Sequence, residues 1–194
     1  MHFSRIAAGL ALAVGLAAVV PVAELSSHQA PPVTVPGIDK PVVLVTGEIT
    51  STETWTNDFY YVLRGAVFVR NAATLNIEAG TWIIGESGSV GTLIVERGGR
   101  LHAVGTREQS IVFTSDQPPG GRNRGDWGGI IINGRAPVNL EGGEGAGEGD
   151  TGVYGGTDPN DNSGTMRYVR VEFAGYAPAQ DAEMSLAEYE DFVF

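Results

Sequence analysis

Two stretches of the sequence decide the fold: TLNIEAGTWI at residues 74–83 and TLIVERGGRL at residues 92–101. They lie 18 positions apart, and Thr, Leu, Glu and Gly recur at matching places in both. Each begins with alternating apolar residues such as Leu75 and Ile77, continues through a glycine, and ends in a second apolar run. Alternation with a period of two is typical of a half-buried strand, and glycine tolerates the positive φ of a tight turn. Each stretch therefore predicts a strand, a turn and a second strand.

The same spacing continues downstream, at residues 110–113 and, after 19 more positions, at residues 130–132. One unit of this size cannot bury its apolar side chains alone, but stacked units can. An antiparallel sandwich is the alternative, although it does not require a constant spacing. We therefore expect an all-β fold, a parallel β-helix (β-solenoid) with coils of about 18 residues. Its two inward columns would be Leu75, Leu93, Ile111 and Ile130, then Ile77, Val95, Phe113 and Ile132.

Composition limits the classes of function. The 194 residues include 28 Gly, and 42% of them are hydrophobic, so a sizeable core can form. The formal net charge of -11 opposes binding to a phosphate backbone or an anionic membrane, and we expect no nucleic-acid partner. The absence of Cys excludes disulfides, thiolate metal sites and cysteine nucleophiles.

Residues 1–30 have the pattern of a secretory signal peptide. Arg5 precedes the uncharged run 6–20, which is shorter than the roughly 20 residues of a spanning helix. We expect a signal helix over residues 1–30, with cleavage after Ala23 or Ala30, and an uncleaved anchor is the alternative. Residues 31–41 contain four prolines and predict an extended linker. This organisation predicts a secreted, periplasmic or cell-surface protein.

The β-helix is expected over residues 42–176, with one interruption. Residues 141–164 hold nine glycines and six acidic residues, and predict an exposed, poorly ordered loop. Residues 177–194 form an acidic tail in which Leu186, Tyr189 and Val193 have helical spacing. We expect this tail to be a short helix that covers the open end of the β-helix incompletely.

The acidic loop contains oxygen ligands at alternate positions, which is the donor type that Ca²⁺ prefers. An EF-hand is excluded, because Ser163 and Val169 stand where its Gly and Glu would be. A looser calcium site remains one interpretation, and a solvated acidic loop is the other; no further cofactor is expected. The candidate calcium ligands are Asp158, Asn160, Asp161 and Asn162.

Two further side chains are candidates for binding or catalysis. Trp127, in the sequence GDWGG, could stack on a sugar ring, or it could pack at a corner of a coil where the neighbouring glycines permit close approach. His102 is the single histidine beyond residue 30, which leaves almost no material for a Ser-His-Asp triad or a histidine zinc site.

Several blocks in fixed order, including GDWGG at 125–129 and RYVR at 167–170, resemble a family of secreted bacterial right-handed parallel β-helix proteins. Its members are catalogued as hypothetical proteins, as lipoproteins or as multidrug transporters. The resemblance covers residues 42–176 and implies the right-handed β-helix fold, but it carries over no catalytic residues. This sequence lacks the lipobox Cys of some members and ends soon after EFAG at 172–175, so we expect a truncated form.

The function expected from the sequence is that of an exported, non-enzymatic β-solenoid that acts as a scaffold or adhesin in the envelope or at the cell surface. The alternative is a carbohydrate-active β-helix that binds or cleaves extracellular polysaccharide. A row of exposed Trp and Tyr along one face would favour the alternative. A polysaccharide or a surface protein would be the partner, and a transmembrane transporter is not expected.

Overall fold

The computed structural model describes residues 28–33 and 39–176. This part of the chain is built of short strands and two 3-10 turns, η1 (Ser87–Ser89) and η2 (Glu148–Asp150). The strands are β1 (Val42–Ile49), β2 (Glu53–Trp55), β3 (Tyr60–Val69), β4 (Thr74–Ile77), β5 (Trp82–Gly85), β6 (Thr92–Val95), β7 (Arg100–Val104), β8 (Ile111–Ser115), β9 (Gly129–Ile132), β10 (Glu144–Ala146), β11 (Val153–Gly155), β12 (Gly164–Arg167) and β13 (Val169–Val171).

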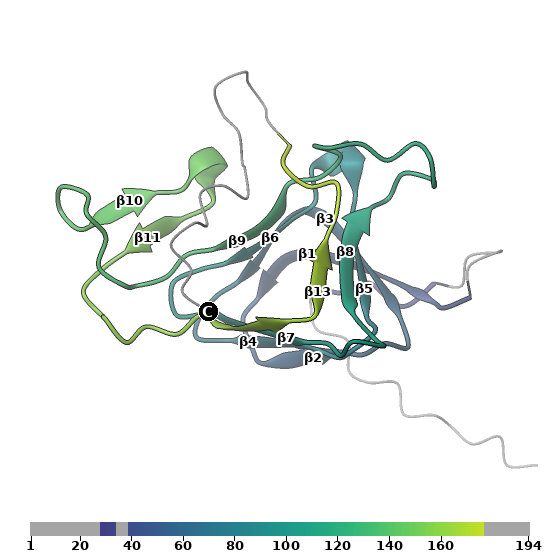
Figure 1. Ribbon diagram of the computed structural model, residues 1–194, viewed down its shortest axis with the longest axis horizontal. Helices are drawn as coiled ribbons and strands as arrows, with labels where there is room; N and C mark the ends of the chain where they lie inside the picture. The colour runs from purple at the N-terminus through teal and green to yellow at the C-terminus, as the bar shows by residue number, and fades with distance from the viewer. Residues whose placement is uncertain (1–27, 34–38, 177–194) are drawn as a thin grey trace, which may run out of the picture.

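The strands form three parallel stacks that enclose the core like the sides of a triangle (Figure 1). The first face contains β5, β8 and β13, the second contains β6 and β9, and the third contains β2, β4, β7 and β12. The long strands β1 and β3 each serve two faces, since β3 pairs with β5 through its first half and with β6 through its second. Glycines with positive φ, Gly47 and Gly65, lie at the bend between the halves. The fold is thus a parallel β-helix.

The core is filled from all three faces by every second residue of each strand. On the first face, Tyr61, Ile83, Phe113 and Val171 occupy one register. On the second, Val69, Val95 and Ile132 do so, and on the third, Trp55, Ile77, Ala103 and Met166. The first coils are fully buried, whereas Ile132, Met166 and Val171 near the last coil are only partly buried. The strands therefore enclose a continuous apolar core that is most open at its C-terminal end.

The expected coil length is wrong, because the strands pair over a longer separation. Leu75 pairs with Leu101 and not with Leu93, and Leu93 pairs with Val67 and Ile130. Neither of the two expected columns therefore exists, namely Leu75, Leu93, Ile111 and Ile130, and Ile77, Val95, Phe113 and Ile132. One pair from each column is present, Leu93 with Ile130 and Val95 with Ile132. The repeat instead relates two corners of the triangle: 74–83 passes from the third face to the first, and 92–101 from the second to the third. Within each repeat the turn is as expected, with φ of 80° at Gly80 and 86° at Gly98.

The interruption after β9 is more regular than expected. Residues 141–164 are expected to be an exposed, poorly ordered loop, but they include a two-stranded antiparallel hairpin, β10 and β11. This hairpin projects from the body beyond β9 (Figure 1). Near the start of the described chain, Gln29 of the expected signal peptide and Val33 of the expected linker form antiparallel bridges with β1. Residues 28–30 of the expected signal helix are described and are not helical. The rest of that helix and the expected C-terminal helix lie outside the described residues.

A pair of engineered cysteines distinguishes the observed register from the expected shorter coil, because the natural chain has no Cys. Asn76 and His102 are partners on neighbouring parallel strands, which places their Cα atoms within the range that a disulfide spans. We expect Asn76→Cys with His102→Cys to cross-link under mild oxidation. Asn76→Cys with Ile94→Cys should stay reduced, as judged by mass spectrometry, because these positions lie on different sheets and only the shorter coil would bring them together. The reverse result would restore the shorter coil.

Leu93 is fully buried in the middle of the second face. Leu93→Ala should lower the free energy of unfolding by about 2–5 kcal/mol, because it removes a packed side chain and leaves a cavity. Thr54→Ala, on the exposed outer side of β2, should change it by less than about 0.5 kcal/mol. Urea titration followed by tryptophan fluorescence measures both. Equal effects of the two substitutions would contradict the core assignment.

Candidate functional site

A chain of ion pairs lies at the corner between the second and third faces. Arg70, Glu96 and Asn133 follow β3, β6 and β9 at equivalent places, and each donates its backbone N–H to the coil before it. Arg70 also joins two carboxylates, with Nη1 2.6 Å from Oε1 of Glu48 and Nη2 2.5 Å from Oε1 of Glu96. The chain leaves the β-helix body at this corner after Asn133 and returns at β12.

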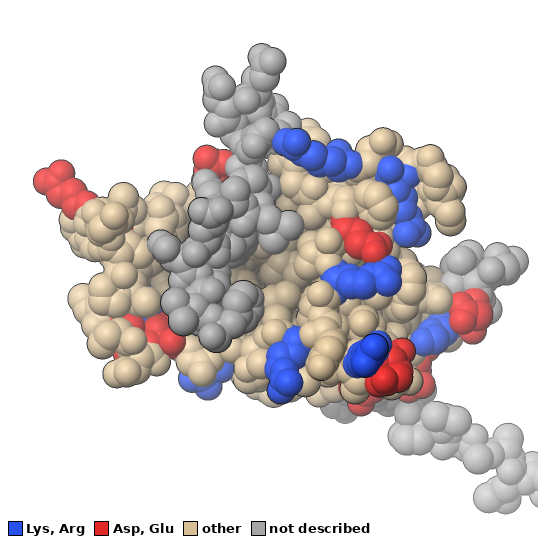
Figure 2. Space-filling model, in the orientation of Figure 1, with Lys and Arg blue, Asp and Glu red and all other residues tan. Residues whose placement is uncertain are grey.

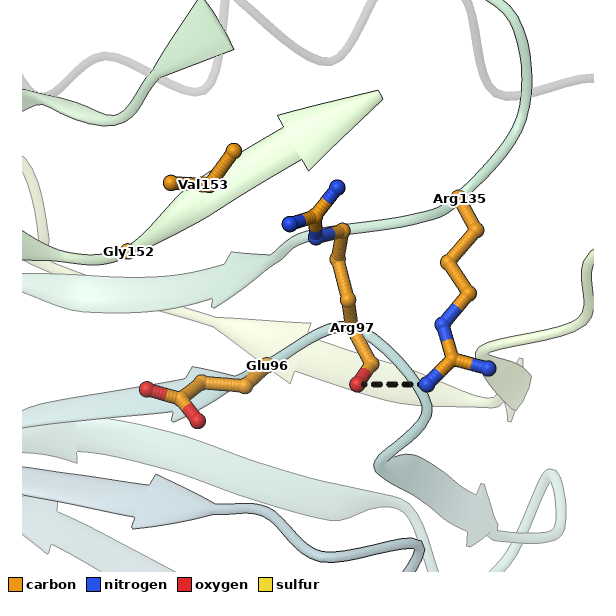
Figure 3. Close-up of a pocket in the computed structure, with 5 residues that line it drawn as sticks. All are labelled: Glu96, Arg97, Arg135, Gly152 and Val153. Carbon is orange, nitrogen blue, oxygen red and sulfur yellow. Dashed lines mark hydrogen bonds between the residues drawn. The ribbon is translucent and has the colours of Figure 1, made fainter. Parts of the chain in front are cut away.

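A hollow of about 460 Å³ opens where the chain leaves the body. We call it the upper hollow. Its walls come from the residues that follow β6, from the segment after β9 and from the start of β11 (Figure 3). The residues that line it are Glu96, Arg97, Arg135, Gly152 and Val153.

Arg97 fastens the hairpin to the body. Its Nη1 donates to Oε1 of Glu144 on β10 at 2.5 Å and to the carbonyl of Gly155 on β11 at 3.0 Å. The base of the hairpin is held again by Asn133, whose Nδ2 donates to the carbonyl of Thr151 at 2.8 Å in a buried position. The wall of the upper hollow is therefore fixed by hydrogen bonds from the β-helix itself.

Arg135 separates the upper hollow from a second one. Its exposed side chain lies against Gly98, where a Cβ atom would collide with the guanidinium. Its Nη2 donates to the carbonyl of Arg97 at 3.3 Å, a contact drawn in Figure 3. Within residues 28–33 and 39–176, no ion pair joins Arg135 to a carboxylate. The lower hollow, of about 220 Å³, is lined by Ala72, Gly98, Arg100, Arg135, Asp158, Asn160, Asp161 and Asn162. We call the two hollows together the corner groove.

The four candidate calcium ligands thus lie together at the lower hollow, but their arrangement does not fit a calcium ion. Three of them accept backbone N–H groups: Asp158 Oδ1 from Asn160, Asp161 Oδ2 from Arg135, and Asn162 Oδ1 from Gly164. Two guanidinium groups, of Arg100 and Arg135, line the same space and would repel a dication. Among the described residues, no group of three or more His, Asp and Glu side chains is placed to hold a metal.

Trp127 does not have the sugar-stacking position expected for it. Its side chain is 0% exposed, its ring is stacked on Phe113 with centroids 6.4 Å apart, and its Nε1 donates to the carbonyl of Glu172 at 2.8 Å. The indole occupies the space that a side chain at Gly85 would fill. The ring of Trp127 packs in the core and its N–H is hydrogen-bonded there. This agrees with the alternative of packing at a coil corner.

Two aromatic residues do face outward, side by side on the first face. Tyr60 and Trp82 are partners in register, and their rings meet edge to face with centroids 6.4 Å apart. Burial raises the pKa of the Tyr60 phenol, and its hydrogen bond to Asp39 at 2.8 Å raises this pKa further. Trp55 and Tyr61, in contrast, are stacked inside the core. Among the described residues Tyr168 and Tyr176 are exposed as well, but Tyr60 and Trp82 are the outward-facing pair whose rings meet.

The residues that sequence reasoning missed are Arg97, Arg100 and Arg135. They are far apart in the sequence, and only the stacking of β9 on β6 brings Arg135 onto the turn at Gly98. The local signal was the paired glycines of ERGGR at 96–100, which permit a close approach. His102 lies on the outer side of β7, beside Asn76 and Thr165, and does not form part of a triad in the described chain.

The arginines of the lower hollow predict the response to calcium. Because Arg100 and Arg135 line the same space and would repel a dication, millimolar CaCl₂ should leave the melting temperature unchanged relative to MgCl₂ and NaCl of equal ionic strength. Differential scanning calorimetry measures this. A calcium-specific rise that Asp158→Ala abolishes would show that the loop rearranges around the ion.

Comparison with known proteins agrees with this geometry. No helix of the described chain has the length and apolar character needed to cross a membrane. No curated protein matches the chain, and no solved structure does. A family model described as a pectate-lyase-like β-helix domain matches residues 47–187, which is well over half of the chain and includes the whole corner groove. The chain belongs to the family of pectate-lyase-like β-helix domains.

Proposed function

We propose that this protein is an exported, non-enzymatic β-solenoid that binds an extracellular polysaccharide in the corner groove. The observation that carries the proposal is the place of Arg135, between two hollows and without a carboxylate partner in the described chain. Membership of a pectate-lyase-like family supports a role related to polysaccharide.

The groove offers the donors and acceptors that a polysaccharide uses. An Arg guanidinium presents a planar fork of N–H donors that matches a carboxylate, so Arg135 would anchor an acidic sugar. Exposed Asp158, Asn160 and Asn162 lie beside it and provide acceptors and amide donors for hydroxyl groups. The chemistry therefore favours a polysaccharide that carries carboxylate groups.

The carboxylates around the groove support binding in preference to cleavage. Glu96 is paired with Arg70, Glu144 is paired with Arg97, and Asp161 accepts the backbone N–H of Arg135 and the hydroxyl of Ser163. A carboxyl group that acts in acid–base catalysis must be able to exchange a proton with the substrate. In this corner Glu96, Glu144 and Asp161 hold the structure instead.

The acidic net charge does not prevent contact with an acidic polymer. Figure 2 shows basic side chains interspersed with acidic ones on the visible face, and not one continuous acidic surface. At physiological salt, charges more than about 8 Å apart are largely screened, so the charged groups nearest to the polymer determine the electrostatic part of its binding. Binding would then depend on Arg135 and Arg100 and would weaken as salt is raised.

The proposal is tested by substitution of Arg135. Arg135→Ala should weaken binding to polygalacturonate about tenfold, because a charge-assisted hydrogen bond contributes about 1.5 kcal/mol. Arg107→Ala removes an exposed arginine from the turn before β8 and serves as the matched control, with unchanged affinity. Isothermal titration calorimetry against polygalacturonate and a neutral dextran measures both. Equal affinity of Arg135→Ala and wild type would contradict the groove as the binding site.

The same samples separate binding from cleavage. Polygalacturonate incubated with the wild-type protein should show no new reducing ends and no absorbance from unsaturated sugars. Cleavage by the wild type that is lost in Arg135→Ala would establish the carbohydrate-active alternative. Capture of a surface protein without any polysaccharide binding would favour a protein adhesin.

A further inference from the structure

The first strand of a β-helix has a free edge, and in this chain residues 28–33 cover it. They run antiparallel to β1, with bridges between Gln29 and Val45 and between Val33 and Val42. Four backbone hydrogen bonds of 2.9 Å hold them, from Ala30 to Leu44, in both directions between Val33 and Val42, and from Thr46 to His28. An uncovered edge is a template for pairing with another chain, so this segment protects the first coil.

Glu53 contacts the side chains of two residues in this segment, His28 and Gln29. Glu53 begins the third face in the register of Leu75 and Leu101, and its side chain is 11% exposed. Its Oε1 lies 2.9 Å from Nε2 of His28, 3.1 Å from Nε2 of Gln29 and 2.8 Å from Nε1 of Trp55. His28 is itself buried, with 4% of its side chain exposed. Two of these three contacts to a nearly buried carboxylate thus come from residues 28 and 29.

Processing of an exported chain decides whether this arrangement exists in the mature protein. The uncharged run 6–20 is followed by Ala23 and Ala30 as candidate cleavage positions. Cleavage after Ala30 would remove His28 and Gln29 and would leave Glu53 with fewer donors in a nearly buried position, which is unfavourable. Cleavage after Ala23 leaves the whole segment in place.

We infer that the leader is removed N-terminal to His28, so that His28 and Gln29 remain in the mature protein and close its first coil over Glu53. This inference rests on the export in the proposed function. It moves the end of the signal peptide from the expected residue 30 to Ala23. Cleavage after Ala23 would give a mature chain that begins at Glu24.

The first experiment reads the mature N-terminus. The full chain is expressed with its own leader in a bacterium with a periplasm, and the exported product is analysed by intact-mass spectrometry and N-terminal sequencing. A first residue at Glu24, or at another position up to His28, is the expected result. A first residue at Pro31 would overturn the inference.

The second experiment measures what the two residues contribute. His28→Ala with Gln29→Ala in the full chain should lower the melting temperature, and joining the leader directly to Pro31 should lower it at least as much and promote oligomers through the free edge of β1. His102→Ala, a half-buried histidine on the outer side of β7, is the matched control and should have little effect. Unchanged melting in both altered N-termini would overturn the inference.

The two proposals fail in different ways. A full chain that stays in the cytoplasm would contradict export, and therefore the proposed function. The effect of His28→Ala with Gln29→Ala on melting can still be measured on that chain, because it does not depend on cleavage. A loss of stability there would support the closing role of His28 and Gln29.

Discussion

The structure depends on backbone hydrogen bonds that run from each coil to the next. A buried N–H or C=O needs a partner, and in this fold the partner belongs to the neighbouring coil. Each strand must therefore match the strands before and after it in direction and register, as β5 matches β3 and β8. Additional residues can be placed only where this matching is not required, at the corners. The segments 86–91, 116–128 and 133–163 all lie at corners, and the last of them forms one wall of the corner groove.

The charged residues at the corner follow from the same matching. Glu48, Arg70 and Glu96 belong to three successive coils, so alternating charges lie next to one another along the axis. An exposed ion pair contributes little stability, with typical values of about 0–1 kcal/mol. Its effect here is one of position: Glu96 is held by Arg70, and Arg97 next to it is directed toward the hairpin. The groove is thus built on a regular part of the molecule and not on a free loop.

The sequence predicted the local structure well and the pairing of strands less well. The alternation of Leu75 and Ile77 and the turns at Gly80 and Gly98 depend on neighbouring residues, and the structure confirms them. The residue that pairs with Leu75 depends on the length of the whole coil. Corner segments of different length change the coil length, and this change is not visible as a period in the sequence. The sequence repeat was therefore interpreted as a coil, although it relates two corners.

The candidate site shows the same division. Asp158, Asn160, Asp161 and Asn162 were recognised as a cluster because they are close in the sequence, and they do line one hollow. The approach of Arg135 to Gly98 could not be predicted locally, because it follows from the pairing of β9 with β6. Trp127 was ambiguous for a related reason, since only the stacking of coils shows that Gly85 leaves room for its indole.

The long excursion between β9 and β12 also bears on how the chain folds. Leu75 pairs with Leu101, one coil later in the sequence. Leu101 pairs with Gly164, which is synthesised only after the whole excursion. Closing the longer loop costs less than about 1 kcal/mol of additional free energy. The two pairings therefore differ mainly in the order in which they form. The first coils can close early, and β12 and β13 can then add to a surface that already exists. The corner groove would accordingly be the last part of the body to acquire its final shape.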